Sequence, residues 1–151
     1  MNFFHDPRYS VSALSGAAIT SATAAGSGDA TAINGAWHPA VDYTSIFAGA
    51  LYTAALTAAK TLTLSCIIQT ASDSSGTGAV TLATLTAEVI TTTGASSGVV
   101  LFNESVPLDV RANLGFIRQV LTPDLSHTAT DTASVAGFIL TGPNRLGQPN
   151  P

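Results

Sequence analysis

Short runs of β-branched and aromatic residues, separated by clusters of Gly, Ser, Asn and Asp, recur along the whole chain. In the clearest run, apolar side chains alternate with hydroxyl side chains, and the apolar ones are Leu62, Leu64, Cys66 and Ile68. Because successive side chains of a strand point to opposite faces, this period of two predicts a strand with one buried face. Repeated strands between turn residues predict an all-β fold, an antiparallel β-sandwich or jelly-roll-like single domain.

Two segments fit a strand or a helix. In Thr44–Leu56 several apolar residues fall at helical spacing and Asp42 suits an N-cap, but Gly49 and the Thr and aromatic content favour a strand. In residues 80–93 the apolar positions fit a short helix, whereas the many Thr residues favour a strand or irregular structure. Both alternatives stay open for residues 80–93.

Turn residues predict how the strands connect. Residues 17–35 are predicted to form a β-hairpin around Gly26 and Gly28, and Thr57–Lys60 a hairpin turn between its flanking strands. Residues 71–78 are expected to form a loop. Residues 99–110 read as a strand that ends near Pro107, which cannot donate a ladder hydrogen bond.

Two apolar strands are predicted near the C-terminus. The first, Phe116–Leu121, carries Arg118 and Gln119 in its middle. An arginine there suits a surface that another chain or sheet covers, because its stem packs while its guanidinium makes hydrogen bonds. The alternative is an edge-strand arginine that faces solvent and prevents unwanted strand pairing.

The second strand, Val135–Leu140, is apolar on both faces, with Val135 and Ile139 on one side and Ala136, Phe138 and Leu140 on the other. A two-layer sandwich leaves one face of each sheet in water. This strand therefore predicts cover from a third layer or from a neighbouring subunit.

The composition is unusually poor in charge. Charged residues make up 9% of the 151 residues, against about 25% in an average soluble domain. Either Thr, Ser and backbone groups solvate the surface, or much of it is packed into an assembly. The length suits one domain.

Several functional classes are disfavoured. The net charge is −4 and no basic run occurs, so direct binding of nucleic acid is not expected. The single cysteine, Cys66, allows no internal disulfide. Residues 11–25 lack the preceding basic cluster of a signal peptide, and Tyr43–Ala59 is too short for a membrane span.

No catalytic, metal or cofactor site is predicted, so the protein is not expected to be an enzyme. The segment Gly94–Gly98 matches G-x-S-x-G formally, but a helix does not follow Ser96 as that motif requires. The three histidines lack metal-ligand spacing. Loop aspartates could ligate calcium, but they lack the EF-hand pattern; they are Asp73, Asp124 and Asp131.

Both ends of the chain read as arms. Residues 1–16 form a predicted N-terminal arm, 17–142 the sandwich and 143–151 a Pro-rich C-terminal tail. Adjacent aromatic residues in the first arm favour docking on a partner. The candidate residues for contact with a capsid or a subunit are Phe3, Phe4, Arg8, Tyr9, Trp37, Arg118, Gln119, Phe138 and Arg145.

About half of the chain resembles small head proteins of tailed bacteriophages, of the decoration or cement type. One part of the resemblance lies in Tyr52, Ala54, Leu56, Thr61, Leu62, Leu64, Gln69 and Asp73. The other lies in Ile117, Arg118, Thr122, Pro123, Asp124, Leu125, Ser126, Thr130, Asp131, Thr132 and Ala133. Where members of that family have an apolar residue after the arginine, this chain has Gln119.

The resemblance implies a β-sandwich subunit without catalytic activity that binds the outside of a phage capsid, often as a homotrimer, and stabilises the shell. The implied partners are the major capsid protein and further copies of the chain, with no nucleic acid and no membrane. The implied location is the capsid exterior of the virion, with the protein made in the host cytoplasm. The alternatives are a lectin-like virion module that binds host glycans, and a head–tail connector or tail subunit.

Overall fold

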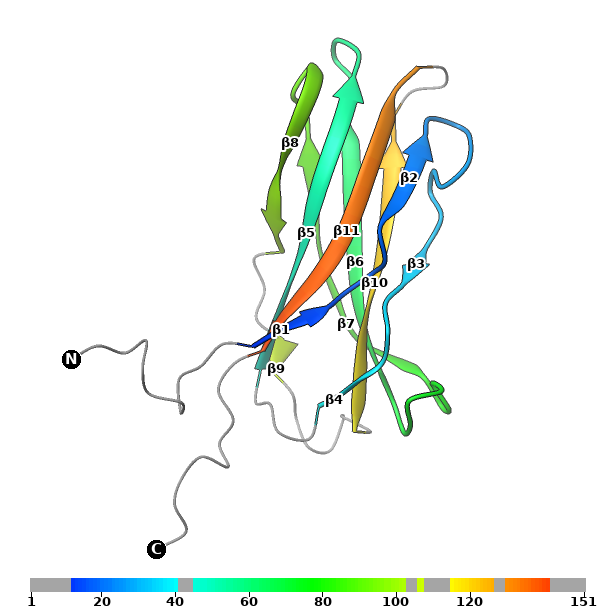
Figure 1. Cartoon of the computed structure of the whole chain (residues 1–151), viewed down its shortest axis with the longest axis vertical. Coiled ribbons are helices and arrows are strands. Elements are labelled where there is room, and N and C mark those ends of the chain that lie inside the picture. The colour runs from blue at the N-terminus through cyan, green and yellow to red at the C-terminus, as the bar shows by residue number, and fades with distance from the viewer. Residues whose placement is uncertain (1–11, 41–44, 103–105, 108–114, 127–129, 142–151) are drawn as a thin grey trace, which may run out of the picture.

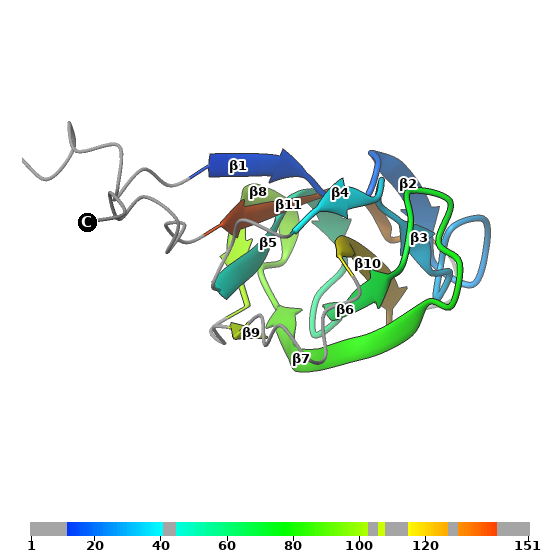
Figure 2. The ribbon, with the colours of Figure 1, turned by 90° about the horizontal axis from the view of Figure 1, so that it is seen from below.

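The computed structural model describes residues 12–40, 45–102, 106–107, 115–126 and 130–141. Two antiparallel sheets pack face to face (Figures 1 and 2). The front sheet, nearest the viewer in Figure 1, consists of β1 (Ser12–Ser15), β2 (Thr20–Thr23), β5 (Ser45–Leu56), β8 (Gly94–Leu101), β9 (Val106–Pro107) and β11 (Thr132–Thr141). The back sheet consists of β3 (Ile33–Asn34), β4 (His38–Pro39), β6 (Leu62–Ala71), β7 (Val80–Ile90) and β10 (Phe116–Leu125). Within the described ranges, no helix is long and apolar enough to cross a membrane.

The strand order is that of a jelly roll. The front sheet runs β2-β11-β5-β8, with β1 continuing the edge beside β2, and the back sheet runs β3-β10-β6-β7. Only β6 and β7 are joined as neighbours within one sheet; the other long connections cross between the sheets. Two four-stranded sheets wound in this way are the jelly-roll arrangement. The predicted all-β sandwich is therefore confirmed.

Both ambiguous segments are strands. Residues 45–56 form β5, in which inward and outward side chains alternate for most of its length. Residues 80–90 form β7, so the helical alternative for this segment is wrong. Both strands pair along nearly their whole length, β5 with a strand far away in the sequence and β7 with the strand across a loop. Helix propensity is a local property and does not include the energy of this pairing.

Two predicted hairpins are wrong. Strands β2 and β3 lie in different sheets, where β2 pairs with β11 and β3 pairs with β10. Residues 57–60 likewise connect β5 of the front sheet to β6 of the back sheet. Turn residues such as Gly28, which has φ of 80°, mark where the chain reverses. They do not determine whether the returning strand joins the same sheet.

Both sheets supply large side chains to the core, and the front sheet adds several small ones. Buried front-sheet residues include Ala48, Ala50 and Ala54 together with Ile46, Leu56, Val135 and Ile139. Buried back-sheet residues include Leu62, Leu64, Ile68, Ile117 and Leu121. Facing layers that alternate large and small side chains can interdigitate without voids.

The side chain of Gln119 links the two sheets through the centre of the core. It projects inward from β10 and is completely buried. Its Oε1 accepts a hydrogen bond from the Ala17 amide at 3.1 Å, and its Nε2 donates to the Gly49 carbonyl of β5 at 3.0 Å. A Cβ atom at Gly16 or Gly137 would overlap Oε1, so glycine is required at both positions. The glutamine therefore satisfies two buried backbone groups of the front sheet.

The same glutamine reaches two further groups. Its Nε2 lies 3.5 Å from the Cys66 sulfur, and its backbone carbonyl accepts from the Gly35 amide at 2.8 Å. Gly35 forms an isolated bridge with Ala17. The segment before β2, the segment after β3, and strands β5, β6 and β10 thus meet at one residue.

Two aspartates hold the loops at the upper end of the sandwich in Figure 1. Asp29 accepts from the amides of Ala25 at 2.6 Å and Leu125 at 2.8 Å. The buried Asp131 accepts from the Thr57 amide at 2.9 Å. Each carboxylate satisfies backbone donors of loops that leave different strands, so these loops are tied to one another.

Replacing Gln119 is expected to destabilise the fold more than replacing Gln69, which is half-buried on the outer face of the back sheet. Gln119→Leu keeps the volume but leaves the Ala17 amide buried without its partner and removes the bond to the Gly49 carbonyl, which costs about 2–4 kcal/mol. Gln69→Leu, on the outer face of neighbouring β6, is the matched control and should cost less than about 1 kcal/mol. Urea unfolding measures both, and equal losses would contradict the bridging role.

Cys66 is expected to be unreactive in the folded protein. Burial raises the pKa of its thiol from 9.0 to about 11, and the hydrogen bond with Gln119 opposes this increase only in part. At pH 8 the thiolate fraction should fall by about 100-fold relative to a free thiol. The native protein should therefore react with a thiol reagent at least that much more slowly than the urea-unfolded chain.

The same raised pKa has a consequence for stability. The folded state favours the neutral thiol. The contribution of Cys66 to the free energy of unfolding is therefore fully present below about pH 9 and is lost as pH rises through 11. Rapid labelling of native protein at pH 8 would contradict the buried position.

Candidate interaction surface

The outer face of the front sheet is free of charge. Its strands β1, β2, β5, β8, β9 and β11 contain no Asp, Glu, Lys or Arg. The back sheet, by contrast, carries Glu88, Arg118 and Asp124. A sheet face exposed to water normally alternates polar and charged residues with the buried ones. This face departs from that pattern over all of its described strands.

The part of this face toward the start of β5 and the end of β8, the lower part in Figure 1, is apolar. Five large hydrophobic side chains are exposed on it, and they are Ile19 (79%), Phe47 (44%), Leu51 (51%), Val99 (61%) and Leu101 (51%). In the ladder of β5 with its neighbours, Leu51 lies opposite Val99 on β8 and Ala136 on β11. Contiguous exposed apolar surface of this kind is typical of an interaction site.

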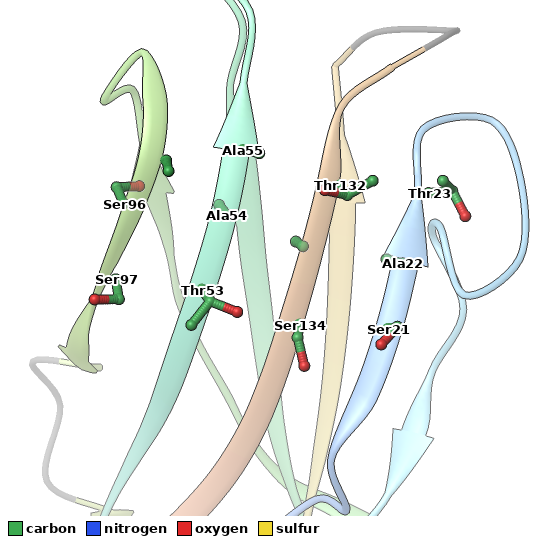
Figure 3. Close-up of a pocket in the computed structure, with 12 residues that line it drawn as sticks. Ser21, Ala22, Thr23, Thr53, Ala54, Ala55, Ser96, Ser97, Thr132 and Ser134 are labelled. Atoms are coloured by element: carbon green, nitrogen blue, oxygen red, sulfur yellow. The ribbon is translucent and has the colours of Figure 1, made fainter.

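The upper half of the same face is a shallow, open groove of about 740 Å³ lined only by Ser, Thr and Ala (Figure 3). Its residues come from β2, β5, β8 and β11, including Ser21, Thr53, Ala55, Ala95 and Thr132. Side chains this small leave the backbone of the sheet at the floor of the groove. The groove offers methyl and hydroxyl groups and no acid, base or aromatic platform.

A second groove of about 470 Å³ adjoins the first and shares Thr53, Ser97 and Ser134 with it. It lies among the apolar residues, with Ile19 at one side and Leu51 at the other. The two grooves together make one continuous surface that changes from small and hydroxylated to large and apolar. We call the outer face of the front sheet, including both grooves, the front face.

The predicted contact residue Phe138 lies on the front face. It projects outward from β11 and its ring lies over Gly49, where a Cβ atom would overlap the ring. The ring is partly exposed. The predicted residues Phe3, Phe4, Arg8, Tyr9 and Arg145 lie outside the described residues, and their role in contacts stays a prediction.

Trp37 and Arg118 lie together on the outer face of the back sheet. The guanidinium of Arg118 stacks over the indole ring, 4.5 Å from its centroid, and its Nε donates to Gln69 Oε1 at 2.8 Å. Gly76 packs against the other part of the ring, where a Cβ atom would lie 2.7 Å from the indole nitrogen. Arg118 therefore bonds within its own chain, whereas its neighbour Gln119 points into the core.

The formal catalytic and metal motifs are dispersed by the fold. Gly94–Gly98 belongs to strand β8 and pairs with β5, whereas an elbow serine sits in a turn between a strand and a helix. His38 contacts the Ser15 carbonyl at 2.7 Å. His5 and His127 lie outside the described residues. Among the described residues, no three His, Cys, Asp or Glu side chains gather as metal ligands would.

Asp73, one of the loop aspartates, is occupied by its own loop. Its Oδ1 accepts from the amides of Ser75 at 2.9 Å and Thr77 at 3.0 Å. Hydrogen bonds from the side chain and backbone of Thr77 hold the pKa of the Asp73 carboxyl below its ordinary 3.8. These bonds order the loop between β6 and β7, which approaches Trp37 through Gly76.

Leu51, Val99 and Leu101 were not among the contact residues predicted from the sequence. The alternation of Ala95, Ser97, Val99 and Leu101 was available, but the predicted strand began only at residue 99. With the strand extended back to Gly94, these positions share one face. That this is the outer face follows only from the pairing of β8 with β5.

No protein-family model matches the chain, and no curated protein matches it. Solved structures match its fold. A chain in the structure of the infectious bursal disease virus Gt strain superposes with a TM-score of 0.58 and 16% identity, covering 94% of this chain and 35% of that one. The Gx strain gives a TM-score of 0.55, 17% identity and the same coverage.

A crystal structure of the T13 particle of the same virus gives a TM-score of 0.50 and 18% identity, covering 90% of this chain and 31% of that one. The chain thus spans about a third of the length of the chains it matches. At these identities the likeness concerns the fold, which is a β-sandwich that also occurs in virus particles.

Removing the guanidinium from Trp37 is expected to change the fluorescence of this single tryptophan. Arg118→Ala uncovers one ring face, so emission should shift to the red and acrylamide quenching should increase, at a stability cost of about 0.5–1 kcal/mol. Lys60→Ala, in the loop between β5 and β6, is the control and should leave the spectrum unchanged. An unaltered spectrum in Arg118→Ala would contradict the stacking.

Proposed function

We propose that this chain is a structural virion protein, a decoration or cement subunit on the outer surface of a tailed-bacteriophage head. The observation that carries the proposal is the front face, an uncharged sheet surface with five exposed large hydrophobic side chains on a jelly roll. The same fold is found in chains of virus particles. The resemblance of residues 52–73 and 117–133 to phage decoration proteins supports the more specific role.

A subunit of this kind stabilises a shell by mass action. If it binds the expanded shell and not its precursor, the stabilisation grows with the ratio of its concentration to its dissociation constant. Many copies on a symmetric lattice add avidity. A front face without charges suits this role, because docking it removes apolar area from water without desolvating any unpaired ion.

The proposed partners are the major capsid protein and further copies of this chain, and a homotrimer is the assembly that the resemblance suggests. The N-terminal arm supplies additional contacts through Phe3, Phe4 and Tyr9. Phe138 and Arg145 are further candidates for contact. Trp37 and Arg118 contact one another, so in the proposed interface they act as one preformed unit.

Glycan binding has less support than capsid binding. Aromatic rings serve as platforms for sugars when a ring face is open, and Trp37 is the only tryptophan. One of its faces is stacked with Arg118. A glycan array with the purified protein separates the two functions, because a capsid subunit should bind none of the sugars.

The proposal is tested by mixing the purified chain with expanded phage heads that lack their decoration protein. Cosedimentation at saturating, stoichiometric levels and an increased thermal stability of the heads are expected. Bovine serum albumin at the same concentration controls for trapping. Absence of saturable binding to heads of its own phage would overturn the proposal.

Deleting residues 2–9 is expected to leave the fold intact and weaken shell binding. Each buried aromatic side chain contributes about 1.5–3 kcal/mol, so the dissociation constant should rise by about 10-fold or more. The Phe3→Ala/Phe4→Ala variant should reproduce most of the loss, and Asn2→Ala should not. Thermal unfolding verifies the fold, and unchanged decoration by the truncated chain would contradict the role of the arm.

A further inference from the structure

We propose that a second copy of this chain docks on the front face, so that two front sheets pack against one another about a two-fold axis. The inference rests on the proposed function in one respect, since assembly on a shell needs surfaces through which copies meet. It assigns the front face to the contact between two copies, so the contact with the capsid is left to the N-terminal arm and the other surfaces, and the two-fold pair replaces the homotrimer that the resemblance suggests. It goes further by naming the surface and its occupant. Three properties of the front face support it, namely its charge, its size and the arrangement of its side chains.

The absence of charge limits what can cover the front face. No Asp, Glu, Lys or Arg occurs in its strands, so a charged group of any occupant would be buried without a partner. The occupant therefore needs a surface that is itself uncharged and largely apolar. The back sheet of this chain does not qualify because it carries Glu88, Arg118 and Asp124. The front face of a second copy does.

The size of the front face suits a dimer. Four strands spaced about 4.8 Å apart, with about eight residues each at 3.3 Å per residue, cover roughly 500 Å² in projection. The accessible surface of a ridged face exceeds its projection, so the burial is of the same order as the 800 Å² per partner of standard interfaces. Sheets packed in this way lie about 10 Å apart.

The side chains of the front face are arranged to complement themselves. Thr53 on β5 and Ser97 on β8 are ladder partners at its centre. Two residues before Thr53 along β5, Leu51 pairs with the large Val99, and two residues after it, Ala55 pairs with the small Ala95. The distances along the strands from the centre are equal in the two directions.

A two-fold axis that runs across the strands at the level of Thr53 uses this arrangement. It places Leu51 of one copy opposite Ala55 of the other, and Val99 opposite Ala95. The apolar ridge of each copy then enters the open groove of its partner, where only Ser, Thr and Ala line the walls. An interface about such an axis is isologous, so every favourable contact occurs twice.

The first test exchanges large and small residues across the axis. Ala55→Leu sets leucine against Leu51 of the other copy, and overpacking should raise the dimer dissociation constant by about 10-fold or more. The double variant Leu51→Ala/Ala55→Leu again pairs leucine with alanine and should return to within about 3-fold of the unaltered protein. Sedimentation equilibrium measures all three, and a double variant weaker than Ala55→Leu would overturn the geometry.

The second test compares exposed valines on the two sheets. Val99→Glu buries an unpaired carboxylate at the interface and should weaken the dimer by about 100-fold. Val89→Glu, on β7 of the back sheet, is the matched control because Val89 is 55% exposed and Val99 is 61% exposed. A larger loss of dimer affinity in Val99→Glu than in Val89→Glu supports the front face as the dimer interface. Equal losses in the two variants would overturn it.

The third test locates the axis. In Thr53→Cys, the new thiol lies near the axis and therefore near the same thiol of the other copy. Facing sheets are too far apart for a disulfide, so a short bismaleimide should link the two chains. Ser65→Cys on the exposed back sheet should give little linked product. The buried Cys66 stays unlabelled in both. Equal linking in the two variants would overturn the assignment of the axis.

Mass photometry and sedimentation separate this inference from the proposed function. A species of twice the 15.2 kDa chain is expected in solution at micromolar concentration. If the chain remains monomeric at a concentration of about 100 μM, its dissociation constant lies above that value, which is too weak for a specific dimer. This result would overturn the dimer. If such a monomer still decorates heads, the proposed function stands alone. If the dimer forms and ignores heads, the docking surface stands and the proposed function fails.

Discussion

The hydrogen bonds of one buried glutamine set the spacing and register of the two sheets. Gln119 leaves β10 in the back sheet and satisfies the Ala17 amide and the Gly49 carbonyl of the front sheet. A buried amide that is fully bonded specifies one arrangement, because any shift of one sheet leaves unpaired polar groups in the core. The glycines at 16 and 137 exist as glycines because the glutamine occupies the space of their side chains.

This bridge is consistent with the different character of the two sheets. Both sheets supply large aliphatic side chains to the core, and the front sheet adds several alanines. The outer faces differ in charge, since the back sheet carries Glu88, Asp124 and the stacked Arg118, while the strands of the front sheet contain no charged residue. An uncharged sheet face with several exposed large hydrophobic side chains has the character of an interaction surface. The proposed dimer and the proposed contact with a capsid are two ways to cover apolar surface in an assembly.

The all-β class followed from local patterns, because alternation with a period of two reports directly on one-sided burial. The strand character of β5 followed from Gly49 and the aromatic and Thr content, despite apolar residues at helical spacing. The sequence did not predict that residues 17–35 and 57–60 cross between the sheets. A turn signal describes four or five residues, while the choice of sheet depends on β10 and β11, which lie far away in the chain.

The sequence by itself determined that this protein is a single sandwich with very few charges, and that Val135–Leu140 would be apolar on both sides. It also showed that Gln119 was unusual for its strand. Only the tertiary structure decided that Gln119 points inward and Arg118 outward to Trp37, and that Leu51 and Val99 meet on one exposed face. The physical reason is that burial and strand pairing depend on contacts between segments that are far apart in the sequence. The spacing of residues within one strand does not show which of its two faces meets the core.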